Sequence, residues 1–224
     1  MTDGQRKKRA RGSARPQQAE QADVDPDQQP AKLDDCRRCA LWRNATQAVP
    51  GEGQRHASIV LVGEQPGDME DLQGKPFVGP AGALLDKALA EAGLKRDDVY
   101  VTNAVKHFKW IARGKRRLHK TPAQREVDAC SYWLEQELVK PDVRVVVALG
   151  ATALKAILDD SHARLQDAFD KTIERGEQRI VATYHPSFAL RAPDPDTRRN
   201  AYEKIVAALQ TAQKLALALA RKGK

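Results

Sequence analysis

Short apolar strands that alternate with helices are the feature that most constrains the fold of this 224-residue chain. Nearly continuous runs of β-branched residues indicate strands buried on both faces, and a helical stretch follows each of them. Strands connected in this way form a parallel sheet between two layers of helices. We therefore predict an α/β fold with three layers, αβα, around a central, mostly parallel, four-stranded sheet. The predicted strands are 57–63, 99–105, 143–150 and 179–185, and the predicted helices are 82–94, 122–139, 151–160 and 199–222.

Three of the four predicted strands end in polar, glycine-rich or histidine-containing loops. The first runs into GEQPG, the second closes with NAVKH, and the fourth is followed by YHPSF. Because ligands of open α/β sheets bind at the carboxyl ends of the strands, these loops mark the expected site.

The first 31 residues differ in composition from the rest of the chain. They are rich in Gln, Pro and charge and contain one Val and no aromatic residue, so they lack the apolar surface that folding requires. We predict a disordered, basic and polar tail over 1–31 and one domain over 32–224. The basic run 6–11 in this tail suits either nonspecific DNA affinity or a solubilising role.

The chain carries a net charge of +8, and the charge is clustered, which favours a nucleic acid as partner. No apolar stretch is long enough for a signal peptide or a membrane span, so we expect a cytoplasmic monomer without a membrane partner.

The loop 63–86 after the first strand contains five glycines and three prolines, which let a backbone approach a ligand closely. It matches neither the GxxxxGK[ST] nor the GxGxxG pattern, so a nucleoside triphosphate or dinucleotide site is not expected. Phe77 lies in this loop rather than on a periodic face, and both a core role and a role in stacking on a ligand stay open.

Three cysteines and one histidine suggest a metal site. Cys36 and Cys39 form a CxxC, Cys130 lies on a predicted helix, and His107 closes a strand end. Such a set suits zinc or an iron–sulfur cluster, and its spacing does not choose between them. The alternative for Cys130 is an inert buried thiol.

Between residues 103 and 125 there are eight Lys or Arg residues and no acidic residue, with Phe108 and Trp110 interleaved. Cations neutralise phosphates and aromatic rings stack on unpaired bases, so this segment is a candidate DNA contact. The core of the segment, RGKRRLHK at 113–120, interrupts the apolar periodicity, and we predict a loop there. Composition alone leaves His119 as part of a cationic clamp or as a reactive group. His185 ends the fourth strand, where Pro186 prevents its continuation.

The motifs GEQPGDMEDLQGKPFVGPAG, VTNAVKHFKW, GKRRLHK and HPSFALR, in this order, resemble the uracil-DNA glycosylases. The resemblance runs from about Leu33 to Leu209 and is to family 4, the iron–sulfur branch, and within it to the X-type proteins that attach covalently to uracil-DNA. It implies the uracil-DNA glycosylase fold and uracil-containing DNA as partner, preferably single-stranded.

The resemblance also implies roles in base recognition. Phe77 would stack on a flipped-out uracil, and Asn103 would bind its amide edge, for which a carboxamide offers both a donor and an acceptor. Gln65, Gly67 and Asp68 would line the same pocket. His185 would hydrogen-bond the uracil oxygen on which charge develops.

In the X-type proteins the histidine of the KRRIH loop attacks C1′ of the sugar. By resemblance this residue is His119, with Leu118 in place of Ile, and Glu64 would orient the ring and compensate its charge. The resemblance further implies a 4Fe–4S cluster, with zinc as the alternative, on Cys36, Cys39, His107 and Cys130. The contacts expected with the DNA backbone are Lys115, Arg116, Arg117, Lys120, Ser187 and Arg191.

Two departures from the X-type pattern bear on this interpretation. Phe188 stands in HPSFALR where the compared proteins have HPSSLLR, and the segment from Phe108 to Lys115 is short. The first rival hypothesis is a turnover glycosylase in which His119 only contacts DNA. The second is a noncatalytic nucleic-acid-binding protein with a structural metal.

Overall fold

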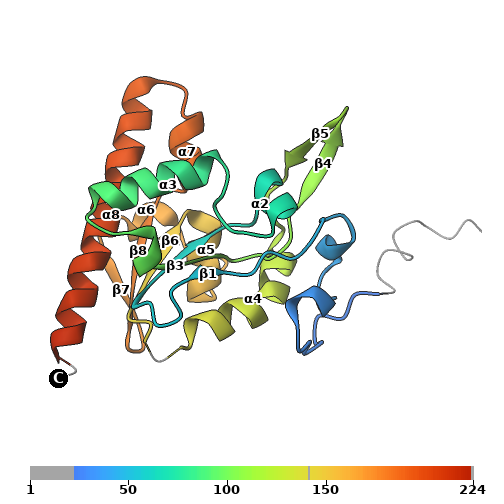
Figure 1. Ribbon diagram of the computed structural model, residues 1–224, viewed down its shortest axis with the longest axis horizontal. Helices are drawn as coiled ribbons and strands as arrows, with labels where there is room; N and C mark the ends of the chain where they lie inside the picture. Colours follow the sequence, from blue (N-terminus) through green and yellow to red (C-terminus); the bar gives the residue numbers. More distant parts are fainter. Residues whose placement is uncertain (1–22, 141, 223–224) are drawn as a thin grey trace, which may run out of the picture.

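A mixed sheet of six strands forms the centre of the computed structural model, which describes residues 23–140 and 142–222 (Figure 1). The strand order is β1-β3-β2-β6-β8-β7. The four inner strands are parallel, and the two edge strands are antiparallel to their neighbours. The strands are β1 (Glu52–Gly53), β2 (Ile59–Gly63), β3 (Tyr100–Asn103), β6 (Val145–Leu149), β7 (Thr172–Arg175) and β8 (Gln178–Thr183).

The four predicted strands correspond to β2, β3, β6 and β8, but the predicted strand number of four is wrong. β1 has only two residues, both exposed, and β7 is a polar TIER segment that is half exposed. Edge strands of this kind bury little apolar surface, so neither produces the hydrophobic run on which the prediction depended.

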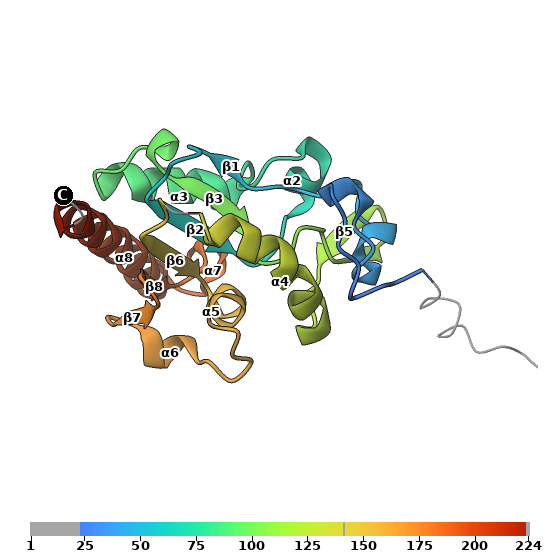
Figure 2. The same ribbon diagram turned by 90° about the horizontal axis from the view of Figure 1, so that it is seen from below.

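Helices cover both faces of the sheet, as the three-layer prediction requires (Figure 2). On one face α3, α7 and α8 pack on apolar side chains of the strands, and on the other face α4, α5 and α6 do so. The four predicted helices are all present, as α3, α4, α5 and α8. The helices are α2 (Asp68–Gln73), α3 (Pro80–Glu91), α4 (Gln124–Leu138), α5 (Ala151–Leu158), α6 (Leu165–Ala168), α7 (Pro186–Arg191) and α8 (Pro195–Lys222), with short 3-10 helices at Leu33–Asp35, Ala40–Arg43 and Arg96–Asp98.

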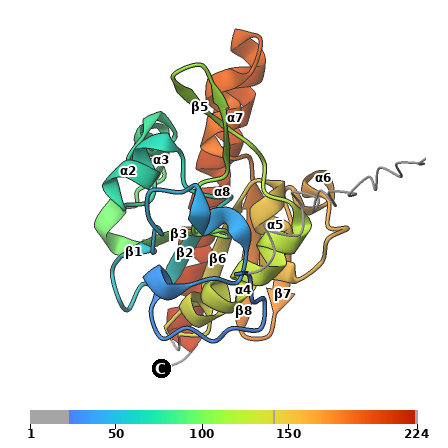
Figure 3. The ribbon, with the colours of Figure 1, turned by 90° about the vertical axis from the view of Figure 1, so that its right-hand side faces the viewer.

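The basic segment forms a β-hairpin, which corrects the prediction of a loop. β4 (Trp110–Arg113) pairs antiparallel with β5 (Arg116–His119), so that Trp110 lies opposite His119. Gly114 takes a φ of +59° at the turn, a conformation that glycine adopts without strain. The hairpin projects from the same end of the molecule as α2 and α7 (Figures 1 and 3).

The predicted tail, 1–31, falls largely outside the described residues, because residues 1–22 are not among them. Residues 23–31 are described and contact the CRRC segment: the Arg37 backbone N–H donates to Gln28 Oε1 at 2.6 Å, and the Asp25 N–H donates to the Arg37 oxygen at 2.9 Å. The division of the chain at residue 31 stays a prediction. Within the described residues, no helix has both the length and the apolar character needed to cross a membrane.

Candidate active site

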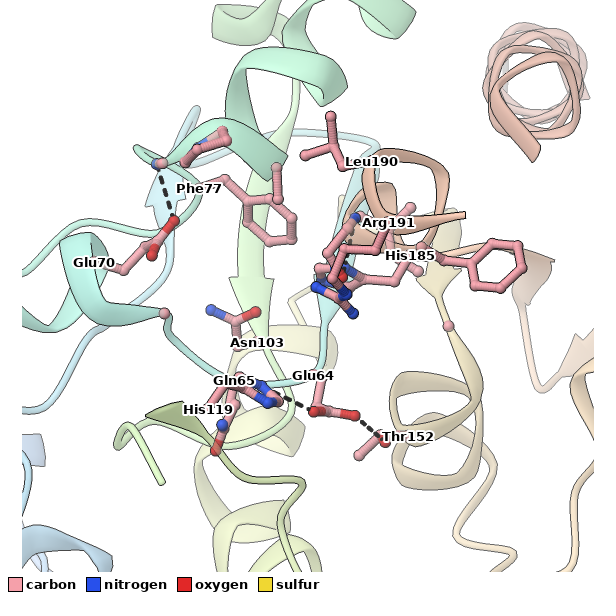
Figure 4. A pocket seen from close by; sticks show the side chains of 18 of the residues that line it. Glu64, Gln65, Glu70, Phe77, Asn103, His119, Thr152, His185, Leu190 and Arg191 are labelled. Atoms are coloured by element: carbon pink, nitrogen blue, oxygen red, sulfur yellow. Dashed lines mark hydrogen bonds and ion pairs between the residues drawn. The ribbon is translucent and has the colours of Figure 1, made fainter. Parts of the chain in front are cut away.

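A pocket of about 530 Å³ opens at the carboxyl ends of β2, β3, β6 and β8. Three sequence-distant loops that the sequence singled out meet there, together with the end of β5 and the start of α5 (Figure 4). Ten residues expected in the site line this pocket, namely Glu64, Gln65, Gly67, Asp68, Phe77, Asn103, His119, His185, Ser187 and Arg191.

Phe77 and Asn103 lie side by side over the end of β2. Asn103 is 2% exposed, and its Oδ1 has no hydrogen-bond partner among the described residues. A Cβ at Gly63 would stand 2.4 Å from Asn103 Oδ1 and 2.6 Å from Phe77 Cζ, so a glycine is required for both side chains to approach. Phe77 has a φ of +55°, which is rare for a residue other than glycine. This backbone conformation is strained, and contacts with the surrounding residues must offset the strain. The pair thus presents a flat face and an unsatisfied amide oxygen.

Glu64 joins the end of β2 to the hairpin and to α5. Its Oε1 lies 3.2 Å from His119 Nε2, and its Oε2 accepts a hydrogen bond from Thr152 Oγ1 at 2.5 Å (Figure 4). Burial raises the pKa of Glu64, but hydrogen bonds from His119 and Thr152 outweigh it, so the net pKa is lowered. The carboxylate is therefore ionised at neutral pH and holds one nitrogen of His119, whose side chain is 49% exposed at the pocket rim.

His185 precedes α7 as its N-cap residue. The Ser187 backbone N–H donates to His185 Nδ1 at 3.1 Å, and Ser187 Oγ lies 2.8 Å from the same nitrogen. Because Nδ1 accepts a backbone N–H, the neutral ring carries its proton on Nε2. Burial lowers the pKa of His185 from 6.5 to about 4, with Arg191 and His119 acting in the same direction. The ring stacks near Phe77, with 5.7 Å between ring centroids.

The side chain of Gln65 is bound to the base of the hairpin. Its Nε2 donates to the main-chain oxygens of Lys109 and Lys120, each at 3.2 Å, and its Oε1 accepts from the Lys109 N–H at 3.1 Å. Gln65 lines the pocket, but its amide is occupied by these contacts. Its predicted part in uracil binding stays a prediction.

The predicted DNA contacts of the hairpin differ in their surroundings. Arg117 Nε lies 2.6 Å from Asp68 Oδ1 and its Nη1 lies 2.6 Å from the fully buried Asp71, so this arginine fastens the hairpin to α2. Among the residues that the structure describes, the side chains of Lys115, Arg116 and Lys120 have no ion-pair partner and point to solvent. These three cations are therefore available to phosphates.

Phe108 is not available to stack on DNA bases, which corrects the expectation for this ring. It is 1% exposed and packs beneath the hairpin, with Arg117 over its face at 5.5 Å and the His119 ring at 6.2 Å. Trp110 is half-buried and donates from Nε1 to the Asn44 oxygen at 2.8 Å.

The expected metal ligands lie between the N-terminal segment and α4. Cys36, Cys130 and His107 are buried and Cys39 is half-buried, and the Cys36 thiol is near enough to help raise the pKa of Cys39 and Cys130. Burial raises the pKa of Cys39 to about 11 and that of Cys130 to about 12, and it lowers the pKa of His107 to about 4. The Lys106 N–H donates to Cys130 Sγ at 3.2 Å.

Three thiols, a neutral imidazole and an N–H bonded to sulfur are donors suited to iron–sulfur or zinc chemistry. No three or more His, Cys, Asp or Glu residues within 23–140 and 142–222 form a group that could hold a metal ion. The four residues therefore fit a metal by the chemistry of their donors and not by their arrangement.

Two residues of the site were not anticipated from the sequence. Thr152 lies in the first turn of α5 and binds Glu64, and its only signal was its place shortly after a strand end. Glu70 is buried and accepts from the Gly79 N–H at 3.0 Å, which ties α2 to the start of α3 and so fixes the loop that carries Phe77.

This arrangement defines an α/β protein with a pocket at the carboxyl edge of its sheet, which an aromatic ring, an amide, two histidines and a carboxylate line. Residues 50–210 match the Uracil DNA glycosylase superfamily, and the chain belongs to that superfamily.

Its relatives include a type-4 uracil-DNA glycosylase of Thermotoga maritima, 39% identical over 173 residues that cover 76% of this chain and 85% of the relative. The type-4 uracil-DNA glycosylase of Archaeoglobus fulgidus is 36% identical over 70% of this chain and 79% of the relative. A type-5 uracil-DNA glycosylase of Thermus thermophilus is 35% identical over 81% of this chain and 92% of the relative.

Proposed function

We propose that this chain excises uracil from DNA and that His119 then becomes attached to C1′ of the deoxyribose. The observation that carries the proposal is the buried, unpartnered Oδ1 of Asn103 beside the Phe77 ring, facing His185 across the pocket. The names of the three relatives described above, each a uracil-DNA glycosylase, support the excision of uracil.

The pocket suits uracil better than it suits a purely apolar ring. A base taken out of the stack lies against the Phe77 face, and the Asn103 amide offers an acceptor for N3–H and a donor for O4. The partner is uracil-containing DNA. Single-stranded DNA is preferred, because no base pair has to be opened before the base enters.

His185 stabilises the departing base. As the glycosidic bond lengthens, its electron pair moves onto uracil, and negative charge grows on a carbonyl oxygen. The neutral His185 ring has its proton on Nε2 and can donate it as a hydrogen bond without itself being charged. Ser187 keeps this tautomer in place.

Capture follows at the sugar. Glu64 binds the proton on one ring nitrogen of His119, Nε2 in this structure, and the other nitrogen keeps its lone pair for C1′. The C1′–N1 bond breaks, its electrons leave with uracil, which takes a proton from solvent, and a new bond from imidazole to C1′ forms. Glu64 offsets the positive charge of the alkylated ring. Lys115, Arg116, Lys120 and Arg191 would hold the phosphates around the site.

A denaturing gel tests the capture. With single-stranded DNA that contains one uracil, we expect a protein–DNA band that survives SDS and heat, and no such band with thymine in its place. His119→Ala should abolish the band. His162→Ala, which alters an exposed histidine outside the pocket, should retain it. A band that persists in His119→Ala would show that another group is attached.

A turnover glycosylase, in which His119 only contacts DNA, is the second candidate, and the type-4 relatives favour it. The exposed rim position of His119 leaves room for water at the sugar. Substrate in large excess separates the two: capture stops after one equivalent of uracil per protein, whereas turnover continues.

We also propose that Cys36, Cys39, His107 and Cys130 hold a 4Fe–4S cluster, with zinc as the alternative. The buried thiols and neutral imidazole support it, and the group would join the N-terminal segment to α4 as a structural tie. Iron at about four atoms per chain is expected, against one zinc for the alternative. Cys130→Ser should lower the iron content, while Ser131→Ala on the same helix should not. Protein that contains neither metal would contradict both forms of the proposal.

A further inference from the structure

Lys106 is a buried lysine whose ammonium group contacts the backbone of Asn103. Its side chain is 1% exposed, and its Nζ donates to the main-chain oxygen of Asn103 at 2.8 Å. The same Nζ donates to Thr102 Oγ1 and to Glu137 Oε2, each at 2.6 Å. Because an ammonium has three N–H donors, the group is fully satisfied by these three acceptors and has a single orientation.

Glu137, in the last turn of α4, gathers four donors on one carboxylate. Its Oε2 accepts from Lys106 and from Thr102 Oγ1 at 2.8 Å, and its Oε1 accepts from the Tyr100 hydroxyl at 3.2 Å and the Gly51 N–H at 3.1 Å. Burial and the nearby Glu137 charge both raise the pKa of Tyr100, so the phenol keeps its proton and donates. The end of α4 is thereby joined to Tyr100 and Thr102 of β3.

The sheet supports Asn103 on one side only, where Gly63 of β2 lies opposite it. On the other side β1 pairs only with Tyr100 and Val101, and β3 ends at Asn103 itself. The main-chain oxygen of Asn103 therefore has no partner in β1, and it accepts a hydrogen bond from Lys106 Nζ instead. The side chain of the same residue enters the pocket with its Oδ1 unpartnered (Figure 4). One residue thus has its backbone anchored and its amide free for a ligand.

We infer that the Lys106–Glu137 pair is a positioning unit that orients Asn103 for the N3–H and carbonyl edge of a pyrimidine base. This inference rests on the proposed function, in which Asn103 binds uracil. Neither residue lines the pocket, so they act through Asn103 rather than on the base. Loss of the carboxylate leaves a buried ammonium without its counter-charge, and the ammonium then moves toward other acceptors and releases the Asn103 carbonyl.

If the Lys106–Glu137 pair had a purely structural role, the expected results would differ. Two variants distinguish this role from the positioning role. Glu137→Gln removes one charge and leaves Lys106 buried without a counter-charge, so it lowers both stability and base recognition. The double variant Lys106→Met with Glu137→Gln removes both charges, and stability should largely return because no charge is left unpaired. Recognition should stay impaired, because nothing then holds the Asn103 oxygen.

The control comes from the same helix. Glu135 is two residues from Glu137 and binds Arg175 at 2.6 Å on the other side of α4, away from Asn103 and the pocket. Glu135→Gln should alter stability alone. Each full-length protein is assayed for single-turnover excision on single-stranded uracil-DNA, for inhibition of that excision by free uracil, and for its melting temperature.

For Glu137→Gln and for the double variant we expect inhibition by free uracil to weaken about 10-fold or more, and for Glu135→Gln we expect no change. If the double variant regains both stability and wild-type inhibition by uracil, the positioning role is overturned and the pair is only structural. If wild-type protein excises no uracil, the proposed function fails and this inference with it. If wild-type protein excises uracil and Glu137→Gln binds free uracil normally, only this inference is overturned.

Discussion

His185 is held neutral by its surroundings, and this makes the stability of the protein depend on pH. Its pKa is about 4 in the folded chain against 6.5 ordinarily, chiefly because of burial, with Glu64 raising it and Arg191 and His119 lowering it. Between these two values the unfolded chain binds the extra proton, so stability is present above pH 6.5 and is lost as the pH falls toward 4. We expect His185 to contribute about 1–3 kcal/mol to this loss.

Urea unfolding at pH 7 and pH 4.5 measures the effect, with His185→Gln compared against wild type. The variant has no imidazole to protonate, so its loss of stability between the two pH values should be smaller by the stated amount. The two proteins share all other titrating groups, whose contributions cancel in the difference apart from that of Glu64, because His185 helps to lower the pKa of Glu64. Equal losses in both proteins would show that the ring is not kept neutral by the fold.

At the scale of elements, the hairpin β4–β5 carries Arg117, which fastens it to α2, and Arg116, which we propose to contact DNA. Arg117→Met leaves the fully buried carboxylate of Asp71 without its cation, so we expect a loss of about 2–4 kcal/mol in unfolding free energy and a looser hairpin. Arg116→Met removes an exposed side chain and should leave stability unchanged. The variant should instead bind DNA more weakly. The slope of log K for DNA binding against log salt concentration should become shallower by the amount that about one phosphate contact contributes.

Thermal unfolding and DNA affinity at several salt concentrations distinguish these outcomes. A stable Arg117→Met protein would mean that Asp68 and Asp71 do not depend on the arginine. A salt dependence that Arg116→Met leaves intact would place the phosphates elsewhere than the hairpin.

The same elements show which parts of the fold the sequence reveals. β2 and β6 are buried along their whole length, so their apolar runs, such as VVVAL, identify them. In β5 the segment RRLH is exposed or half-buried, and its strand conformation follows from the Gly114 turn and from contacts with Gln65 and Asp71. Those partners lie tens of residues away, and no local pattern encodes them.

At the scale of the whole molecule, local sequence patterns predicted only part of the candidate site. Motif resemblance selected ten of the residues that line the pocket, because they fall in the loops at strand ends. The resemblance implied His119 as a partner of Glu64, but Thr152, which is 88 residues distant, was missed. The Lys106–Glu137 pair, which spans 31 residues, was missed as well. Charge and polarity in the sequence show that such side chains need partners, and only the topology decides which ones they meet.

The domain boundary is the remaining whole-molecule expectation, and two shortened chains test it. One begins at Asp23 and the other at Lys32, so they differ only by residues 23–31. The longer chain keeps the bonds of Gln28 and Asp25 to the CRRC segment, in which Arg38 also donates to the Gln28 oxygen. At roughly 1 kcal/mol for each of these hydrogen bonds, the shorter chain should melt about 5–10 °C lower. Equal melting temperatures of the two chains would place the boundary at residue 31. A lower melting temperature of the shorter chain would extend the folded domain to residue 23.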